Sequence, residues 1–360
     1  MSQVSDLPTT QRAIVLTEHG EIDGLSVVSD HPVAELGPTE VLLRVRASSL
    51  NYHDIFTVRG MPGITIPMPV VPGLDVAGEI AAVGAEVADW QVGQVVVINP
   101  LREDFSLIGE VVDGGLAEYC LVDANQLIAI PAGVSPAQAA ALPVAYGTAH
   151  RMVITQDAIH AGDTVLVLGA SGGVGTAGVQ LAKHLGARVV AAVGSDEKAQ
   201  RMLELGADEV INYREQDFYQ WTKEHLGKPS RSGYEGGFDV IINNTGGDTW
   251  HPTLRSTKRG GRILVCGATA GFDPTEDLRY IWSFELRVIG SNGFTTEDIS
   301  ALLQLVADGK IDPVLDSVVP LEEGITSLQR LADRDVIGKA VIAPAGVEAA
   351  NAAVTEAAAR

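Results

Sequence analysis

The stretch TVLVLGASGGVG at residues 164–175 joins a short apolar segment directly to a glycine-rich turn. Residues 164–168 predict a buried β-strand, and the apolar pattern of residues 174–185 predicts a helix that opens inside the turn. Glycines let the backbone approach a pyrophosphate closely, and the first turn of a helix offers free N–H groups and the positive end of its dipole. We therefore interpret this stretch as a dinucleotide-binding loop.

The register of the loop decides which residues would contact the phosphates. A literal Gly-x-Gly-x-x-Gly fits Gly173, Gly175 and Gly178, but that register starts too far into the helix. The register in which alanine replaces the first glycine directly follows the strand, and we prefer it for that reason. The predicted cofactor-binding residues of the loop are then Ala170, Gly172, Gly173 and Val174.

Downstream of the loop, strand and helix patterns alternate. Further apolar strands are predicted at residues 188–193, 210–211, 240–242 and 263–265. Continuous apolar strands separated by helices are typical of a parallel sheet that is covered on both faces. We therefore predict an α/β fold with a Rossmann-type, doubly wound dinucleotide-binding domain over residues 135–290.

Upstream of the loop, the chain consists of short β segments broken by glycine and proline, with few helices. This pattern predicts a β-rich domain, a barrel or a sandwich, over residues 1–134. Residues 291–345 contain an amphipathic segment and short β pieces, which we expect to return to the first domain. The alanine-rich tail, residues 346–360, is expected to be a frayed helix or disordered.

Composition excludes several classes of protein. Lys and Arg number 25 against 46 Asp and Glu, a net charge of −21 that repels nucleic-acid phosphates. No stretch approaches the roughly 20 apolar residues of a membrane span, and residues 1–6 lack the features of a signal peptide. Cys120 and Cys266 are too few for a disulfide framework. We expect a reduced, cytoplasmic protein that binds neither nucleic acid nor membranes.

The end of the second predicted strand bears on which dinucleotide is bound. An NAD enzyme carries a carboxylate there for the ribose 2′-OH. Ser195 and Lys198 would suit a 2′-phosphate instead, and Tyr213 follows the third strand and could flank the same pocket. Asp196 could serve NADH, and it could also be simply an acidic residue in the first turn of a helix, with Lys198 on a solvated face. We predict NADPH, with NADH as the alternative.

Several motifs, in order along the chain, resemble the medium-chain dehydrogenase/reductase superfamily. They are PGLDVAG at residues 72–78, GGLAEY at 114–119, the nucleotide loop, LGAD at 205–208 and Gly338-Lys339. The resemblance covers nearly the whole chain, and it implies that the β-rich domain is a GroES-like β-barrel catalytic domain.

The residues at the family's metal positions depart from the zinc-dependent members. Zinc alcohol dehydrogenases place a ligand Cys where this chain has Asn51 and a ligand His where it has Leu74. The region of their structural-zinc lobe, residues 99–114, contains no cysteine here. The chain is instead similar to the zinc-independent quinone oxidoreductase branch, which includes enoyl and enone reductases and which NYHD at residues 51–54 matches. We predict that no zinc is bound.

This resemblance also implies roles for individual residues and an oligomeric state. It places Asn51 and Tyr52 at the nicotinamide and the substrate, and Thr148 under the cofactor. The remaining implied cofactor contacts are Thr245, Gly267 and Ala268 through backbone groups, and Lys198 and Tyr213 at the 2′-phosphate. Related enzymes are often homodimers through the edge of the nucleotide-domain sheet, for which residues 281–289 are the predicted edge strand.

Without a metal, the chemistry favours acceptors whose reduction leaves a delocalised anion. Hydride addition to a simple ketone leaves a basic alkoxide, which zinc normally stabilises. Addition to a conjugated carbonyl or a quinone leaves an enolate or a hydroquinone anion, for which hydrogen bonds suffice. We predict an NADPH-dependent quinone or α,β-unsaturated carbonyl reductase. A zinc-free alcohol or aldehyde dehydrogenase and a non-catalytic NADPH-binding protein are the alternatives.

Tyr52 is the predicted proton donor to the developing oxyanion or the α-carbon, with Asn51 as an orienting amide. Tyr52 could equally be an aromatic residue that only lines the pocket, with solvent supplying the proton. His53, beside Asp54, is a second candidate acid. Neighbouring residues of a regular strand point to opposite faces, so only one of Tyr52 and His53 would face the ligand, and we favour Tyr52.

Overall fold

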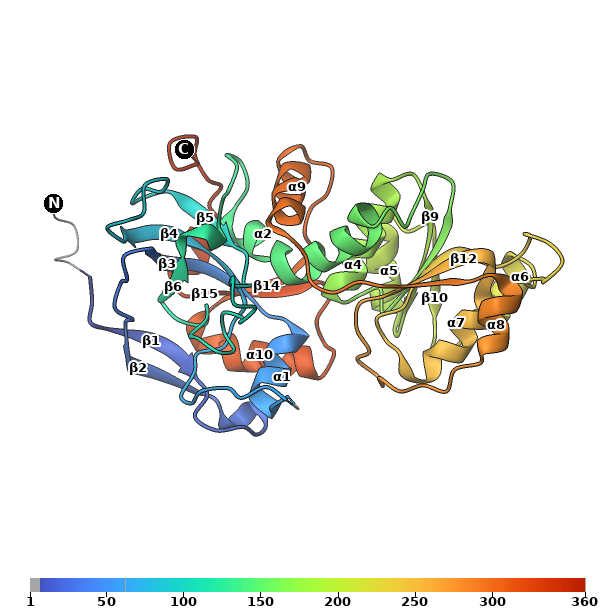
Figure 1. Ribbon diagram of the computed structural model, residues 1–360, viewed down its shortest axis with the longest axis horizontal. Coiled ribbons are helices and arrows are strands. Elements are labelled where there is room, and N and C mark those ends of the chain that lie inside the picture. The colour runs from blue at the N-terminus through green and yellow to red at the C-terminus, as the bar shows by residue number, and fades with distance from the viewer. Residues whose placement is uncertain (1–6, 62, 360) are drawn as a thin grey trace. The chain divides into compact units, whose positions relative to one another are not determined.

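The chain forms two compact units in the computed structural model, which describes residues 7–61 and 63–359 (Figure 1). The sequence interpretation of residues 1–6 therefore lies outside the described residues. Unit 1 contains the residues up to Ala145 and those from Thr295 onward, and unit 2 is Tyr146–Phe294. Within the described part of the chain, no helix has the length and apolar character needed to cross a membrane.

Unit 2 is built on a six-stranded parallel sheet with the order β10-β9-β8-β11-β12-β13. The chain runs outward from β8 to β10, crosses to β11 beside β8, and then runs outward to β13. This order confirms the doubly wound fold, with its switch point between β8 and β11. The strands are β8 (Thr164–Leu168), β9 (Arg188–Val193), β10 (Glu209–Asn212), β11 (Phe238–Ile242), β12 (Thr257–Val265) and β13 (Arg287–Gly290).

Helices cover the sheet of unit 2, so its central strands are buried on both faces. The helices are α3 (Thr148–His150), α4 (Gly173–His184), α5 (Asp196–Glu204), α6 (Phe218–His225), α7 (Trp250–Ser256) and α8 (Leu278–Phe284). The edge strand predicted at residues 281–289 is wrong in its first half, which belongs to α8. The side chain of Asp277 caps this helix by accepting from the Arg279 N–H, and the strand starts only at Arg287.

Unit 1 contains a seven-stranded sheet with the order β14-β15-β3-β4-β5-β7, in which β6 also pairs with β3. A separate antiparallel ribbon joins β1 (Thr10–Val15) to β2 (Ser26–Pro32). The remaining strands are β3 (Glu40–Ser49), β4 (Asp75–Val83), β5 (Val95–Ile98), β6 (Tyr119–Asp123), β7 (Leu127–Ala129), β14 (Leu315–Pro320) and β15 (Lys339–Ala343). Because β15 pairs antiparallel with β3, the last part of the chain completes the sheet that the first part begins.

Five helices belong to unit 1, as far as the described residues show. They are α1 (Tyr52–Arg59), α2 (Pro136–Ala140), α9 (Thr296–Ala307), α10 (Gly324–Ala332) and α11 (Val347–Asn351). A buried apolar cluster gathers side chains of β1, α1, α10 and β15, and it includes Ile14, Ile55, Leu328 and Ile342. This core anchors α1, the helix that begins at Tyr52 and directly follows Asn51.

Two parts of unit 1 differ from the sequence expectations. Helix α2 packs on β3 and β4 and belongs to unit 1, whereas the sequence interpretation started the second domain at residue 135. The tail is ordered rather than frayed: Val354 is 4% exposed, and its backbone exchanges hydrogen bonds of 2.9 Å with Gly133 and Val134. The Ala358 carbonyl also accepts from the N–H of Val95, so the tail satisfies a donor of β5.

Candidate active-site and cofactor-binding residues

The carboxyl ends of five parallel strands carry the predicted cofactor-binding residues of unit 2. Since the strands are parallel, these ends lie along one edge of the sheet, on both sides of the switch point. The structure brings to this edge the loop after β8 (Ala170, Gly172, Gly173, Val174), Ser195 and Lys198 after β9, Tyr213 after β10, Thr245 after β11, and Gly267 and Ala268 after β12. Thr148 lies elsewhere, in α3, which packs against α4.

The loop after β8 has the geometry of a phosphate cradle. Gly169 has φ +61°, in the left-handed region, and a Cβ on Gly175 would lie 2.3 Å from the Gly169 carbonyl oxygen. Gly172 is exposed, and a Cβ there would approach only the same carbonyl oxygen, at 3.6 Å. Helix α4 has no acidic residue in its first turn. These residues therefore fit a pyrophosphate, which the N–H groups and the dipole at this helix end would hold.

The ends of β9 and β10 form a second, smaller feature beside this loop. The Ser195 hydroxyl accepts from the Lys198 N–H at 3.3 Å and so caps α5. A Cβ on Gly194 would lie 2.5 Å from the Tyr213 hydroxyl, so the Tyr213 side chain lies directly over this glycine. The Asp196 carboxylate accepts from the Asn212 side chain at 3.0 Å. One carboxylate oxygen of Asp196 is thus occupied within the protein.

Asn243, at the end of β11, is a residue that the sequence interpretation missed. It is buried, and its side-chain oxygen accepts from the N–H groups of Thr245 and Gly246 at 3.0 and 2.9 Å. Its amide donates to the hydroxyl of Thr253 at 2.9 Å. Asn243 therefore fixes the loop that carries Thr245. The sequence signal that could have identified Asn243 is its position, an amide side chain directly after three apolar strand residues.

In unit 1, the regular strand assumed for residues 51–54 is wrong, because helix α1 begins at Tyr52. The Asp54 carboxylate accepts from the Asn51 N–H at 2.7 Å and satisfies a donor at the start of this helix. Successive helical residues differ by only about 100° in direction, so Tyr52 and His53 are not forced onto opposite faces. The half-buried Tyr52 ring packs edge-on against Phe56, with ring centres 5.3 Å apart.

Asn51 lies in a buried polar cluster with Asp75 and Lys339. The Lys339 ammonium group donates to the side-chain oxygen of Asn51 and to the Leu50 carbonyl, the latter at 2.7 Å, and lies 3.2 Å from the Asp75 carboxylate. The Asn51 amide donates to Asp75 at 2.8 Å and to the Ser49 carbonyl at 3.3 Å. Both amide hydrogens are thus used inside the cluster, and the role of Asn51 as an orienting amide stays a prediction.

Burial dominates the electrostatics of this cluster. It raises the pKa of Asp75 and lowers the pKa of Lys339, and in each case the charged partner opposes the shift. Burial also raises the pKa of Asp54 to about 6, although the Asn51 N–H and His53 oppose the shift. The sequence interpretation assigned no role to Asp75, Lys339 or Glu110. The sequence did carry a signal for Asp75 and Lys339, because each is a single charged residue at the start of an apolar strand.

His53, next along α1, lies beside a second buried carboxylate. Its Nε2 atom is 3.6 Å from Oε1 of Glu110, and the side chains are 28% and 5% exposed. Both atoms are buried, and the structure gives neither a hydrogen-bond partner among the described residues. Burial lowers the pKa of His53, but Glu110 and Asp54 outweigh this effect and raise it above its ordinary value.

The residues at the family's zinc positions do not fit a zinc ion. Asn51 is held by an ammonium group, and Leu74 is an apolar side chain buried in the core. Zinc in proteins is bound by thiolate, imidazole and carboxylate ligands. Among the described residues, no group of three or more His, Cys, Asp or Glu side chains is placed to hold a metal ion.

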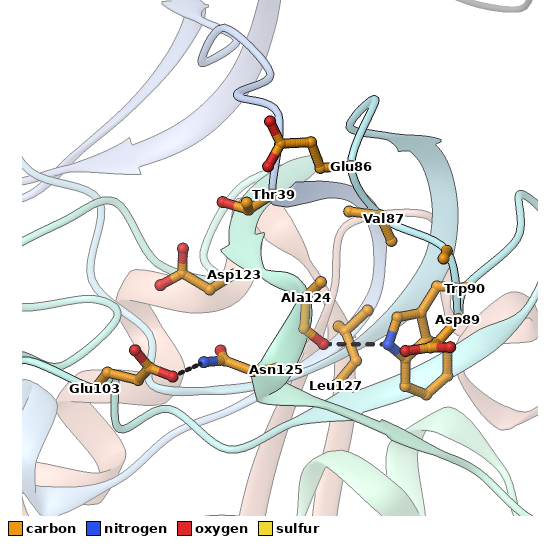
Figure 2. Close-up of a pocket in the computed structure, with 11 residues that line it drawn as sticks. Thr39, Glu86, Val87, Asp89, Trp90, Glu103, Asp123, Ala124, Asn125 and Leu127 are labelled. Carbon is orange, nitrogen blue, oxygen red and sulfur yellow. Dashed lines mark hydrogen bonds between the residues drawn. The ribbon is translucent and has the colours of Figure 1, made fainter.

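A separate hollow of about 710 Å³ lies in unit 1 (Figure 2). Carboxylates of Glu86, Glu103 and Asp123 surround it, which disfavours an anionic cofactor. Two of its polar groups are already satisfied, because the Trp90 ring N–H donates to the Ala124 carbonyl and the Asn125 amide donates to Glu103. None of the predicted site residues lines this hollow.

Two family models match the chain. Residues 37–132 match the alcohol dehydrogenase GroES-like domain, and residues 173–308 match the zinc-binding dehydrogenase model.

Two relatives and a solved structure are similar over most of the chain. The NADPH-dependent alkenal/one oxidoreductase of Arabidopsis thaliana is 32% identical, over 94% of this chain and 81% of that protein. The quinone oxidoreductase of Homo sapiens is 30% identical, over 87% and 91%. The structure of a 2-octenoyl-CoA carboxylase reductase in complex with NADP and 2-octenoyl-CoA matches with a TM-score of 0.84 and 27% identity, over 94% of this chain and 88% of that one.

Proposed function

The chain belongs to the medium-chain dehydrogenase/reductase family, in its quinone oxidoreductase-like branch, and on this premise we propose that it reduces quinones or α,β-unsaturated carbonyl compounds with NADPH and without zinc. The observation that carries the proposal is the Lys339 ammonium group held against Asn51 and Asp75. A metal-free site has no Lewis acid for a simple alkoxide, so it suits acceptors that leave a delocalised anion.

We propose that the edge of the unit 2 sheet binds the cofactor. The N-terminus of α4 and the glycines of its loop would hold the pyrophosphate, and Thr245, Gly267 and Ala268 would contact the nucleoside or nicotinamide. Ser195, Lys198 and Tyr213 would take the 2′-phosphate. The hydrogen bond from Asn212 to Asp196 supports NADPH, because it engages the carboxylate that NADH would need. When bound, the cofactor supplies hydride.

In unit 1, we propose that Tyr52 donates a hydrogen bond to the oxygen on which negative charge develops. A phenol is well suited to this role because its O–H is a stronger hydrogen-bond donor than water. Asn51 is the residue directly before α1, and its amide is held by Asp75 and Lys339. It thereby fixes the start of the helix and positions Tyr52. Thr148 remains a predicted cofactor contact.

We also propose a homodimer joined through β13, which lies at the edge of the unit 2 sheet. Leu278 and Trp282 of the neighbouring helix α8 are 65% and 69% exposed, an apolar surface of the kind that interfaces cover. Light scattering would measure the mass in solution. The cytoplasm is the proposed location, since both cysteines are free.

Stopped-flow NADPH oxidation tests the proposed reaction, with a quinone, an open-chain enone and a simple ketone as acceptors, each with and without a chelator. Turnover of the quinone or enone that does not respond to the chelator is the expected result. Ketone reduction that the chelator abolishes would overturn the zinc-free assignment. NADPH binding without turnover of any acceptor would leave a non-catalytic NADPH-binding protein.

A further inference from the structure

His53 and Glu110 present two buried polar atoms that lack hydrogen-bond partners within the described chain. Nε2 of His53 and Oε1 of Glu110 are 3.6 Å apart, longer than a hydrogen bond but within the range of an ion pair. A buried carboxylate without a partner is costly, so such groups usually serve a purpose beyond stability. A proton on Nε2 would make the two groups an ion pair.

Close backbone packing fixes the position of Glu110. A Cβ on Gly109 would lie 2.7 Å from the Gly73 carbonyl oxygen, and one on Gly114 would lie 2.3 Å from the same atom. The loop around Glu110 is therefore packed directly on Gly73. The Gly73 N–H in turn donates to Asp54 at 3.1 Å, which ties this loop to α1. The carboxylate is thus held beside His53 by the fold of unit 1.

We infer that His53 delivers the proton that the α-carbon of an unsaturated carbonyl acceptor takes up, and that Glu110 orients and charges its imidazole. This inference rests on the proposed function. In this proposal Nε2–H is directed at buried Glu110, and Nδ1–H of the 28% exposed His53 side chain is the proton that the acceptor receives. Carboxylate–imidazole pairs in acid–base catalysis divide the two ring nitrogens in this way.

The proton step balances in atoms and electrons. Once the β-carbon has received hydride from the reduced nicotinamide, the acceptor is an enolate. A C–H bond forms at the α-carbon, the Nδ1–H bond of the imidazolium breaks, and its electron pair stays on the nitrogen. His53 becomes neutral and regains a proton from solvent. Tyr52 keeps its separate role as hydrogen-bond donor to the enolate oxygen.

Charged groups around His53 support this role. The groups that face it among the described residues are Glu110, from the loop packed on Gly73, and Asp54, on its own helix. Both raise the pKa of His53, against the effect of burial, so the imidazole stays cationic to higher pH than an ordinary histidine. An acid that must be protonated at neutral pH needs this environment.

The stereochemistry of protonation tests the inference. An open-chain enone with an α-methyl group is reduced in D₂O, and the configuration of the new C–D centre is measured. The wild-type protein is expected to give one configuration. His53→Gln should lose about 100-fold in kcat and give both configurations, because solvent then supplies the deuteron. A single configuration with unchanged kcat in His53→Gln would overturn the inference.

The pH profile tests the contribution of Glu110. The wild-type kcat/KM should fall as pH rises through the pKa of His53. Glu110→Gln should move this fall to lower pH by about one unit, while Glu110→Asp, which keeps the charge, should restore part of the shift. If kcat/KM of Glu110→Gln decreases at the same pH as that of the wild-type protein, the role of Glu110 is overturned. Tyr52→Phe should lower kcat and leave the fall where it is.

Matched controls separate this pair from structural effects. His31 and Asp113 form another His–carboxylate pair in unit 1, at 2.8 Å, and His31→Gln should change neither stereochemistry nor pH profile. NADPH affinity and thermal unfolding are measured for each variant, and His53→Asn replaces His53→Gln if the latter does not fold. A wild-type protein that reduces no acceptor would overturn the proposed function, whereas turnover with unchanged stereochemistry in the variants would overturn only the assignment to His53.

Discussion

Lys339 donates hydrogen bonds to oxygen atoms that come from a distant part of the chain, at Leu50, Asn51 and Asp75. Lys339→Met keeps most of the side-chain volume but leaves the Asp75 charge buried without its counter-ion. The free energy of unfolding should fall by about 3–5 kcal/mol, as measured by chemical denaturation. Lys183→Met is the control, because Lys183 pairs with Asp208 at the surface and should contribute about 1 kcal/mol or less. Equal losses in the two variants would contradict the buried ion pair.

The Asp54 carboxyl gives the stability of unit 1 a pH dependence of its own. Burial raises the pKa of this carboxyl from its ordinary value of 3.8 to about 6 in the folded protein. The folded state therefore binds the proton more tightly than the unfolded state does. The stabilisation is fully present below pH 4 and is lost as pH rises through 6, by about 3 kcal/mol in all. Between pH 4 and 7, wild-type protein should therefore lose about this much more unfolding free energy than Asp54→Asn. Parallel pH curves for the two proteins would exclude the shift.

Sequence reasoning succeeded where neighbouring residues determine the structure and failed where distant ones do. The loop at Gly172 and the alternating strands of unit 2 follow from local patterns, so their fold was predictable. The cluster at Asn51 was not, because Lys339 lies 288 residues away. Helix α1 was missed for a related reason: its residues lack a clear apolar stripe, and Asp54 stabilises its start. The predicted roles of the site residues stay predictions.

At the level of elements, the contact between α4 and the loop after β8 depends on Gly175. Gly175→Ala would place a methyl group 2.3 Å from the Gly169 carbonyl oxygen and push the helix away from the loop. Such overpacking costs about 1–3 kcal/mol, so NADPH should bind about 5- to 150-fold more weakly in a fluorescence titration.

Gly178→Ala is the matched control for this prediction, in the same helix. The new methyl group would meet only ends of side chains, at Ile242 (3.1 Å) and Val167 (3.8 Å), and alanine favours the helix. NADPH affinity should stay within about twofold of wild type, since the loop is not displaced. Similar losses in both variants would mean that the glycines support the helix in general and not the cofactor loop.

The tail gives a second prediction for an element, this time in unit 1. Val354 is buried, and its backbone pairs with residues 133 and 134. Val354→Ala removes buried methyl groups and should lower the free energy of unfolding by about 1–2 kcal/mol, measured by denaturant titration. Ala353→Ser, at the exposed neighbouring position, should change it by less than about 0.5 kcal/mol. No loss in the valine variant would show that the tail does not pack in solution.

For the whole molecule, the net charge of −21 should affect how charged acceptors arrive. An acyl-CoA ester is anionic and is repelled over a distance of about one Debye length, which shortens as salt is added. At saturating NADPH, kcat/KM for an enoyl-CoA should rise several-fold from low to physiological ionic strength, while a neutral enone shows no such rise. Steady-state kinetics at a series of salt concentrations measures both, and equal responses would exclude a field effect.

The return of β15 to β3 means that the sheet of unit 1 cannot be completed until Lys339–Ala343 has been synthesised. Unit 2 is one continuous stretch, Tyr146–Phe294, and can fold as soon as it leaves the ribosome. Asp75 emerges 264 residues before Lys339, which at ordinary translation speeds is a delay of roughly 10 to 50 seconds. During that interval the end of β3 at Ser48 and Ser49, which pairs with β15 in the finished sheet, lacks its partner strand. Slower translation between Asp75 and Lys339 would therefore lengthen the time for which the Asp75 carboxylate has no counter-ion and the sheet of unit 1 stays incomplete.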